Sequence, residues 1–272
     1  MGIAIAVGSI VAAPAGDRFV LTAAAAVAAA AGLSATSIGV FGGVLVPGLL
    51  LLGIEPRVAA PLSLALQVLV IPIGATSHAA LGHVRRGITV PLTVGGVIGS
   101  ASGALLSSTV SAEIVGRAVA VVIIVVGVIV LVMPRAGCAA DDVGAGEIHP
   151  LRIGGIGTVA GFASGISGAG WGPIGVKLLI LSRIDPRHAI GSSLIGRVAM
   201  AVAALATYAL SAAAGRGGEL DLWLFTVLLA TSTAAMTPGA VLMARIGRRP
   251  AAAAVAVLSI GLALPTLFTG AR

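Results

Sequence analysis

Charged residues are scarce in this chain of 272 residues. Asp, Glu, Lys and Arg together make up 9% of it, whereas soluble domains carry roughly 25%. Hydrophobic residues make up 58%, and the mean hydropathy is +1.15. A water-soluble protein of this length needs a polar surface, and too few polar side chains are present to form one. The composition therefore excludes a soluble globular domain and predicts an all-α polytopic membrane protein.

Cysteine and aromatic residues are also few, which excludes further classes of protein. Cys138 is the only cysteine, so the chain can form neither an intrachain disulfide nor a thiolate metal cluster. The formal net charge is +7, but the basic residues are scattered between apolar stretches, with no basic run and no aromatic platform for nucleic acid. We therefore expect no nucleic-acid partner, no metal and no cofactor, and we interpret the basic residues as determinants of membrane topology.

The apolar residues are grouped into eight blocks, four on each side of a polar stretch. A membrane-spanning helix needs about 20 residues, and most blocks supply this length directly. The block 19–53 is too long, because as one helix it would reach about 52 Å, against a hydrocarbon core of about 30 Å. This block and 153–181 each contain a glycine cluster, so we expect a broken or re-entrant helix in both. The blocks are 19–53, 57–81, 88–108, 112–133, 153–181, 189–213, 222–243 and 251–269.

The two groups of four blocks resemble each other in sequence. The segment "IEPRVAAPLSLALQ" at 54–67 aligns with "IDPRHAIGSSLIGR" at 184–197, at a constant offset of 130 residues. At the same offset, "FGGVLV" aligns with "WGPIGV". We therefore expect an internal duplication. It divides the chain into a first transmembrane repeat (19–133), a polar linker (134–152) and a second transmembrane repeat (153–269).

The arginines distinguish two arrangements of these repeats. If each long block crosses the bilayer once, the repeats are parallel and seven arginines face each side. If each long block folds back on itself, nine arginines face one side and five the other. The positive-inside rule favours the second arrangement. It makes the repeats inverted and places both termini outside, an arrangement that supports rocking between two access states.

The glycine clusters, "FGGVLVPG" at 41–48 and "GISGAGWGP" at 165–173, indicate candidate sites. A helix interrupted inside a membrane leaves backbone groups unpaired, which is tolerated only beside protein or a water-filled cavity. The first turn of a half-helix presents free N–H donors and the positive end of a dipole, which attract anions. The alternative is that the glycines serve close helix packing. Two clusters at equivalent places in a duplicated chain favour a site.

Two basic residues, Lys177 and Arg197, lie within the predicted spans, whereas all nine acidic residues lie outside the spans or at their edges. Burying a lone cation in a bilayer costs at least about 2.5–3.5 kcal/mol on insertion scales. No carboxylate in the spans can pair with either residue, so a dissolved anion is the expected partner. Snorkelling towards an interface is the alternative, chiefly for Lys177. The repeat offset aligns Arg197 with Gln67, a neutral amide, so the site would be asymmetric.

Both halves carry a glycine-rich signature. The first half has "GVFGGVLVPGLLLLGIEPRVAAPLSLAL" and "SHAALGHVRRG", and the second has "GFASGISGAGWGP" followed by "DPRHAIGSSL". These segments resemble the duplicated signature of the TauE/SafE sulfite exporter family, also called the TSUP transporters. The similarity extends from about residue 19 to 269. It implies a polytopic transporter of sulfite, sulfonates or other small oxyanions. The second half departs from the pattern at 176–177, where "VK" replaces the "VP" common in the family.

We expect a secondary transporter that exports a small oxyanion, such as sulfite, a sulfonate or a related organic anion, by alternating access between the two broken regions. The spans lack the carboxylate usual for proton coupling, and an inside-negative potential drives anions outward. The alternatives are an anion channel and an intramembrane serine protease. The expected setting is the cell (inner) membrane, multi-pass, and a homo-oligomer is compatible with the sequence. The expected substrate contacts are backbone donors at Gly42, Gly43, Gly170 and Gly172, charge from Arg197 and Lys177, and neutral hydrogen bonds from Ser63, Gln67, Ser192 and Ser193.

Two further motifs are weaker indications of function. "GISG" at 165–168 resembles the serine motif of intramembrane rhomboid proteases, which need a histidine on another helix. The downstream candidate, His188, lies in the turn between two blocks, which argues against a protease. His78 and His83 are five residues apart and could bind protons or a metal. A pair of histidines without a carboxylate is weak evidence for a metal site, and interfacial positions are the simpler interpretation.

Overall fold

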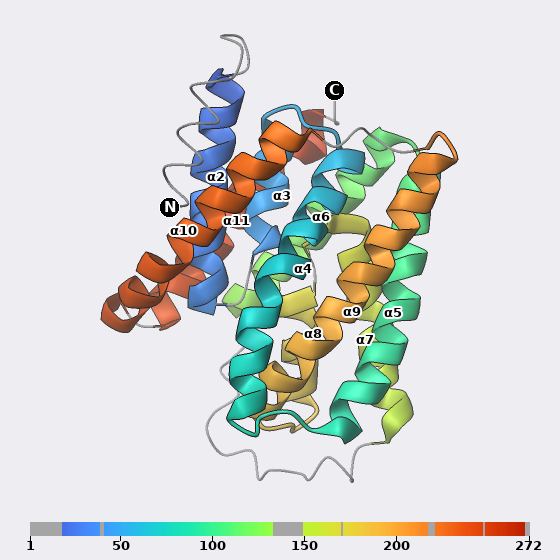
Figure 1. Cartoon of the computed structure of the whole chain (residues 1–272), viewed down its shortest axis with the longest axis vertical. Coiled ribbons are helices and arrows are strands. Elements are labelled where there is room, and N and C mark those ends of the chain that lie inside the picture. The colour runs from blue at the N-terminus through green and yellow to red at the C-terminus, as the bar shows by residue number, and fades with distance from the viewer. Residues whose placement is uncertain are drawn as a thin grey trace.

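The computed structural model describes residues 18–38, 41–132, 149–169, 171–216, 221–246 and 248–269. These residues form helices joined by short turns, with no strand among them (Figure 1). The apolar lead-in to Arg18, Cys138, Gly170 and most of the predicted linker lie outside the described residues. Within them, the protein is all-helical, as predicted.

The helices of the first half begin and end close to the limits of the apolar blocks. The block 19–53 is divided into two helices, and the three blocks that follow form one helix each. The helices are α2 (Arg18–Ile38), α3 (Gly42–Leu51), α4 (Pro56–Ala80), α5 (Arg86–Thr109) and α6 (Ala112–Val132).

The second half repeats this order of one divided block and three undivided ones. Pro150 and Pro186 stand at the first position of their helices, where the missing N–H is not needed. The helices are α7 (Pro150–Ser167), α8 (Trp171–Leu181), α9 (Pro186–Ala213), α10 (Leu222–Ile246) and α11 (Arg248–Thr269).

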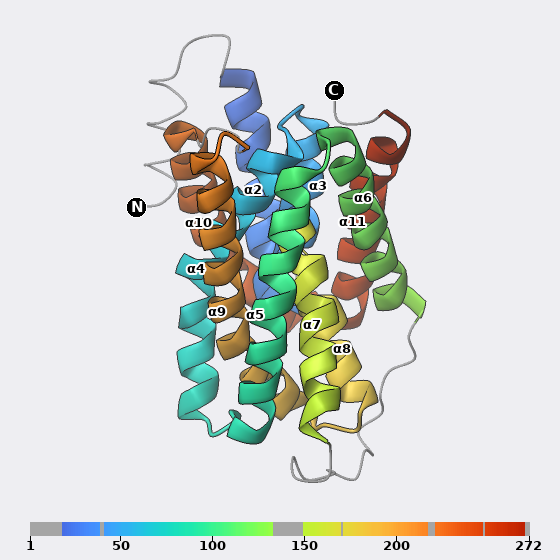
Figure 2. The same ribbon diagram turned by 90° about the vertical axis from the view of Figure 1, so that its right-hand side faces the viewer.

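The chain reverses its direction inside the bundle at both divided blocks. α3 runs back towards the end of the bundle where α2 begins, and α8 runs back towards the end where α7 begins (Figures 1 and 2). Gly168 follows the last residue of α7. Its φ of +64° is the left-handed conformation that glycine adopts without strain. The amide of Gly168 still donates to the Ser164 carbonyl at 2.7 Å. The glycine at the end of α7 therefore stops that helix and turns the chain.

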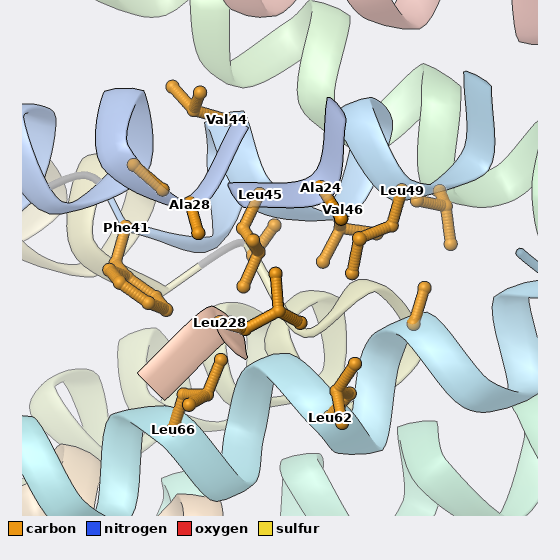
Figure 3. Packing of buried hydrophobic residues seen from close by; sticks show 14 of the residues in the cluster. Ala24, Ala28, Phe41, Val44, Leu45, Val46, Leu49, Leu62, Leu66 and Leu228 are labelled. Carbon is orange, nitrogen blue, oxygen red and sulfur yellow. The ribbon is translucent and has the colours of Figure 1, made fainter. Parts of the chain in front are cut away.

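Most of α3 is enclosed by other helices. Every residue from Gly42 to Leu49 is buried. In Figure 3 the side chains of α3 lie among Ala24 and Ala28 of α2, Leu62 and Leu66 of α4, and Leu228 of α10. Because protein surrounds the first turns of α3, their backbone is kept away from lipid, which is the condition under which a broken helix is tolerated in a membrane.

Helices of the two halves pack against each other through small residues. α7 lies along α5 and α2 lies along α10. A Cβ placed on Gly99 would lie 2.1 Å from the Thr158 carbonyl oxygen, and one on Gly32 would lie 2.2 Å from the Ser232 carbonyl oxygen. Such close approach of backbones is typical of membrane helices whose interface consists of small residues. Part of the glycine content therefore serves packing.

Among the described residues, three helices are long and apolar enough to cross a membrane, namely those that contain Arg18–Ala35, Arg86–Thr109 and His188–Ala213. Shorter apolar stretches occur in α3, α4, α10 and α11. Large apolar side chains such as Phe19, Val132 and Leu210 are more than 70% exposed on the outside of the bundle. An apolar outer surface of this kind is solvated by lipid, and the protein is a membrane protein.

Candidate functional site

The candidate site lies where α4, α9 and the break between α7 and α8 meet. Ser63 and Gln67 are one turn apart on the same face of α4, and both are buried. The Ser63 hydroxyl donates to the Gly168 carbonyl at 3.0 Å, and the Gln67 Nε2 amide donates to the same oxygen at 2.8 Å. The Gly168 carbonyl lies at the end of α7, where it has no partner within its own helix. Two neutral donors from the first half of the chain therefore satisfy it.

Arg197 brings a charge into this network from α9. Its Nη2 donates to Gln67 Oε1 at 3.1 Å, and the residue is only 9% exposed. Its Nε is buried and has no hydrogen-bond partner among the described residues. The acidic residues of the described segments, Glu55, Glu113, Asp185 and Asp221, stand before a helix or in its first turn. None of these four carboxylates forms an ion pair with Arg197.

The two helix breaks contact each other beside Ser63. A Cβ placed on Gly42, the first residue of α3, would lie 2.2 Å from the Gly168 carbonyl oxygen and 2.9 Å from the Ser63 hydroxyl. A Cβ on Gly168 would in turn lie 2.7 Å from the Ala60 carbonyl oxygen. The absence of side chains at both positions therefore lets the first break, the second break and α4 meet at one point.

Two further polar groups hold the end of α7 in place. The Tyr208 hydroxyl donates to the Gly165 carbonyl at 2.8 Å. Tyr208 lies eleven residues after Arg197, which is about three helical turns, so the two side chains share a face of α9. The Ser167 hydroxyl donates to the Ala163 carbonyl at 2.7 Å and accepts from the Ala169 amide at 3.1 Å. Tyr208 is not among the site residues predicted from the sequence. As the single tyrosine of the chain, within an otherwise apolar span, it could have been identified there.

Four of the predicted site residues therefore come together, whereas Ser192 and Ser193 bond to groups outside this network. Ser192 accepts from the Arg85 amide at 3.1 Å, and Ser193 donates to the Ile190 carbonyl at 2.9 Å. Gly43 is buried in α3, Gly172 is in the first turn of α8, and Gly170 lies outside the described residues. Lys177 is partly buried in α8. The residues brought together are Gly42, Ser63, Gln67 and Arg197.

The histidines and the "GISG" serine form no second site of this kind. The Nδ1 atoms of His78 and His83 are 3.2 Å apart, and the ring of His188, in the first turn of α9, lies 6.5 Å from that of His83. No group of three or more metal-binding side chains occurs in the described segments. The hydroxyl of Ser167 bonds to backbone groups on either side of it. This local capping role gives the serine no histidine partner such as a protease needs.

Comparisons with known proteins agree with this membrane architecture. The model of the family "Sulfite exporter TauE/SafE" matches residues 24–265. The curated "Probable membrane transporter protein YtnM" of Bacillus subtilis (strain 168) is 26% identical over 198 residues, which are 71% of this chain and 64% of that protein. The chain thus spans just under two thirds of the relative's length. No solved structure matches. Because the family model covers nearly the whole chain, the chain belongs to the TauE/SafE sulfite exporter family of membrane transporters.

Proposed function

We propose that this protein is a secondary transporter that exports a small sulfur-containing oxyanion across the cell membrane by alternating access. The observation that carries the proposal is the buried guanidinium of Arg197. Its hydrogen-bond partner is the neutral side-chain amide of Gln67. Among the described residues, its Nε has no hydrogen-bond partner and no carboxylate forms an ion pair with it. A cation in this setting is costly unless an anion compensates it.

The neighbouring groups are suited to an oxyanion. The planar guanidinium can offer two parallel N–H donors to one anionic group. On the next helix, Ser63 and Gln67 offer a hydroxyl and an amide, neutral donors that do not compete with the substrate for the positive charge. In the present conformation these donors bond to the Gly168 carbonyl. An arriving oxyanion would compete with a backbone carbonyl and an amide oxygen, both weaker acceptors than a charged oxygen.

The course of the chain supports inverted repeats. α4 ends and α5 begins at the end of the bundle where α8 ends and α9 begins, whereas α2 begins and α11 ends at the opposite end (Figures 1 and 2). Arg85, Arg183 and Arg187 therefore belong to the first of these ends. Under the positive-inside rule, we assign this end to the cytoplasm. The hairpins α2–α3 and α7–α8 then enter the bundle from opposite sides.

The packing of the two halves supports two access states. α5 packs closely along α9, and midway along these helices the Ser100 hydroxyl donates to the Met200 carbonyl at 3.0 Å. At the end assigned to the cytoplasm, a Cβ on Gly191 of α9 would lie 2.5 Å from the carbonyl oxygen of His83, in the turn before α5. α10, which corresponds to α5 in the duplication, has few contacts with α4 among the described residues. If the repeats exchange these two arrangements, the cytoplasmic end opens while the outer end closes.

A flux assay in proteoliposomes tests the proposal. We expect saturable uptake of labelled sulfite that unlabelled sulfite and sulfonates inhibit. Arg197→Gln should weaken the apparent affinity, because the charge for the anion is lost. Arg117→Gln is the matched control, because Arg117 is exposed and paired with Glu113; it should leave flux unchanged. Flux that never saturates would instead indicate an anion channel, and equal flux in both variants would reject Arg197 as the binding residue.

A further inference from the structure

The charge of the candidate site comes from one residue. The groups joined by hydrogen bonds around Gly168 are the Ser63 hydroxyl, the Gln67 amide and the guanidinium of Arg197. The Tyr208 hydroxyl of α9 adds a neutral group one turn earlier in α7, at the Gly165 carbonyl. Among the described residues, Arg197 is the only charged side chain that hydrogen bonds join to this network. The network therefore carries a formal charge of +1.

The nearby helix ends add little to this charge. The carbonyl end of a helix carries a partial negative charge and the amide end a partial positive one. Here the carbonyl end of α7, at Gly168, lies directly against the amide end of α3, at Gly42. Because the opposite ends face each other at contact distance, each offsets the other. Each break also joins the carbonyl end of one helix to the amide end of the next, α2 to α3 and α7 to α8. Carbonyl ends and amide ends therefore offset one another, and the helix ends supply no net charge to compensate a second negative charge on a substrate.

From this charge balance we propose that the site takes a singly charged oxyanion, such as a sulfonate or hydrogen sulfite, in preference to a doubly charged one. The inference rests on the proposed function. The oxyanion displaces Gln67 Oε1 from the guanidinium, so that the Gln67 side chain marks the position of one substrate oxygen. A doubly charged anion would leave one negative charge without a partner in the membrane interior, where the penalty corresponds to roughly 100-fold weaker binding.

The neutral side chain at position 67 is essential to this assignment. Gln67 accepts from Arg197 through Oε1 while its Nε2 donates to the Gly168 carbonyl and to Ser63. A carboxylate at this place would pair with Arg197 and cancel the charge. A second cation would raise the charge to +2 and suit a doubly charged anion. Position 67 therefore determines how many charges the site can take.

Methyl sulfate and sulfate form a matched pair of probes, because they differ by one charge and share the oxygen-rich face of the sulfur. In proteoliposomes that take up labelled methanesulfonate, we expect methyl sulfate to inhibit at a concentration roughly 100-fold below that of sulfate. This measurement needs no variant, so it does not depend on the folding of a mutant. Equal or stronger inhibition by sulfate would overturn the charge assignment.

Two variants of Gln67 then test the origin of the selectivity. Gln67→Arg should shift the preference towards sulfate by at least tenfold, and Gln67→Met, which keeps the charge at +1, should preserve the preference for methyl sulfate. A Gln67→Arg protein that transports methanesulfonate with the original preference would overturn the role of position 67. If none of the three anions is transported or competes in the wild-type protein, the proposed function itself fails and this inference fails with it.

Discussion

Replacing Gly42 by alanine tests whether contact between the two helix breaks holds the site together. The added Cβ would lie 2.2 Å from the Gly168 carbonyl oxygen, 2.8 Å from Ala169 Cα and 2.9 Å from the Ser63 hydroxyl. Two of these three atoms belong to the backbone and cannot rotate away. Because carbon and carbonyl oxygen normally approach to about 3.3–3.6 Å, the two breaks would have to separate by roughly 1 Å.

This separation would lengthen both hydrogen bonds to the Gly168 carbonyl, from Ser63 at 3.0 Å and from Gln67 at 2.8 Å. Overpacking costs about 1–3 kcal/mol, and a hydrogen bond between membrane helices contributes about 0.6 kcal/mol on average. We therefore expect the free energy of unfolding to fall by about 2–4 kcal/mol. Transport should fall roughly 10- to 100-fold, because a displacement of this size misplaces Gln67 relative to Arg197.

Thermal unfolding in detergent and anion flux in proteoliposomes measure the two effects. Gly155→Ala is the matched control, because Gly155 lies in α7 and an added Cβ there has no other atom within 4 Å. Alanine is favoured over glycine inside a helix by about 1 kcal/mol, so the control should be at least as stable as the wild-type protein. A Gly42→Ala protein that unfolds and transports like the control would refute the reasoning.

Two other predictions concern the membrane. In a Cys138→Ser background, a cysteine beside Arg216 should react with an impermeant thiol reagent in intact cells and one beside Arg248 should not; reaction of both from outside would contradict the inverted arrangement. With valinomycin and potassium setting the potential, efflux of a singly charged substrate should rise as the interior becomes more negative. A potential of 100 mV supplies about 2.3 kcal/mol per charge, enough for a concentration ratio of roughly 50. Efflux that does not change with the potential would contradict export driven by the potential without a coupling ion.

The limits of the helices could be predicted because their signals are local. The proline at the start of α9 and the glycine at the end of α7 act through their own backbone conformation, and hydropathy marks the apolar spans directly. The division of both long blocks followed from their glycine clusters, together with the excessive length of the block 19–53. The alignment of Gln67 with Arg197 also identified the two side chains that the structure joins by a hydrogen bond.

The partners within the site could not be predicted in the same way. The Gly168 carbonyl accepts from Ser63 and Gln67, which are more than 100 residues distant in the chain. Which carbonyl these side chains reach depends on how α4 packs on the end of α7, and periodicity within either segment contains no information on that. The same limit applies to Ser192. It is next to Ser193 in the sequence, but its hydroxyl accepts a hydrogen bond from the backbone amide of Arg85, just before α5.

The packing of α7 on α5 and of α2 on α10 has a consequence for biosynthesis. α7 finds its partner α5 already made when it leaves the ribosome, because α5 precedes it in the chain. α2 is in the reverse position, since α10 is the last helix but one. Through most of translation the small-residue face of α2 around Gly32 has no helix to pack on, and contacts this distant in sequence form late. α2 is thus among the last of the described helices to reach its native neighbours, although it is made early, and a nascent chain interrupted after α9 leaves that face exposed to quality control.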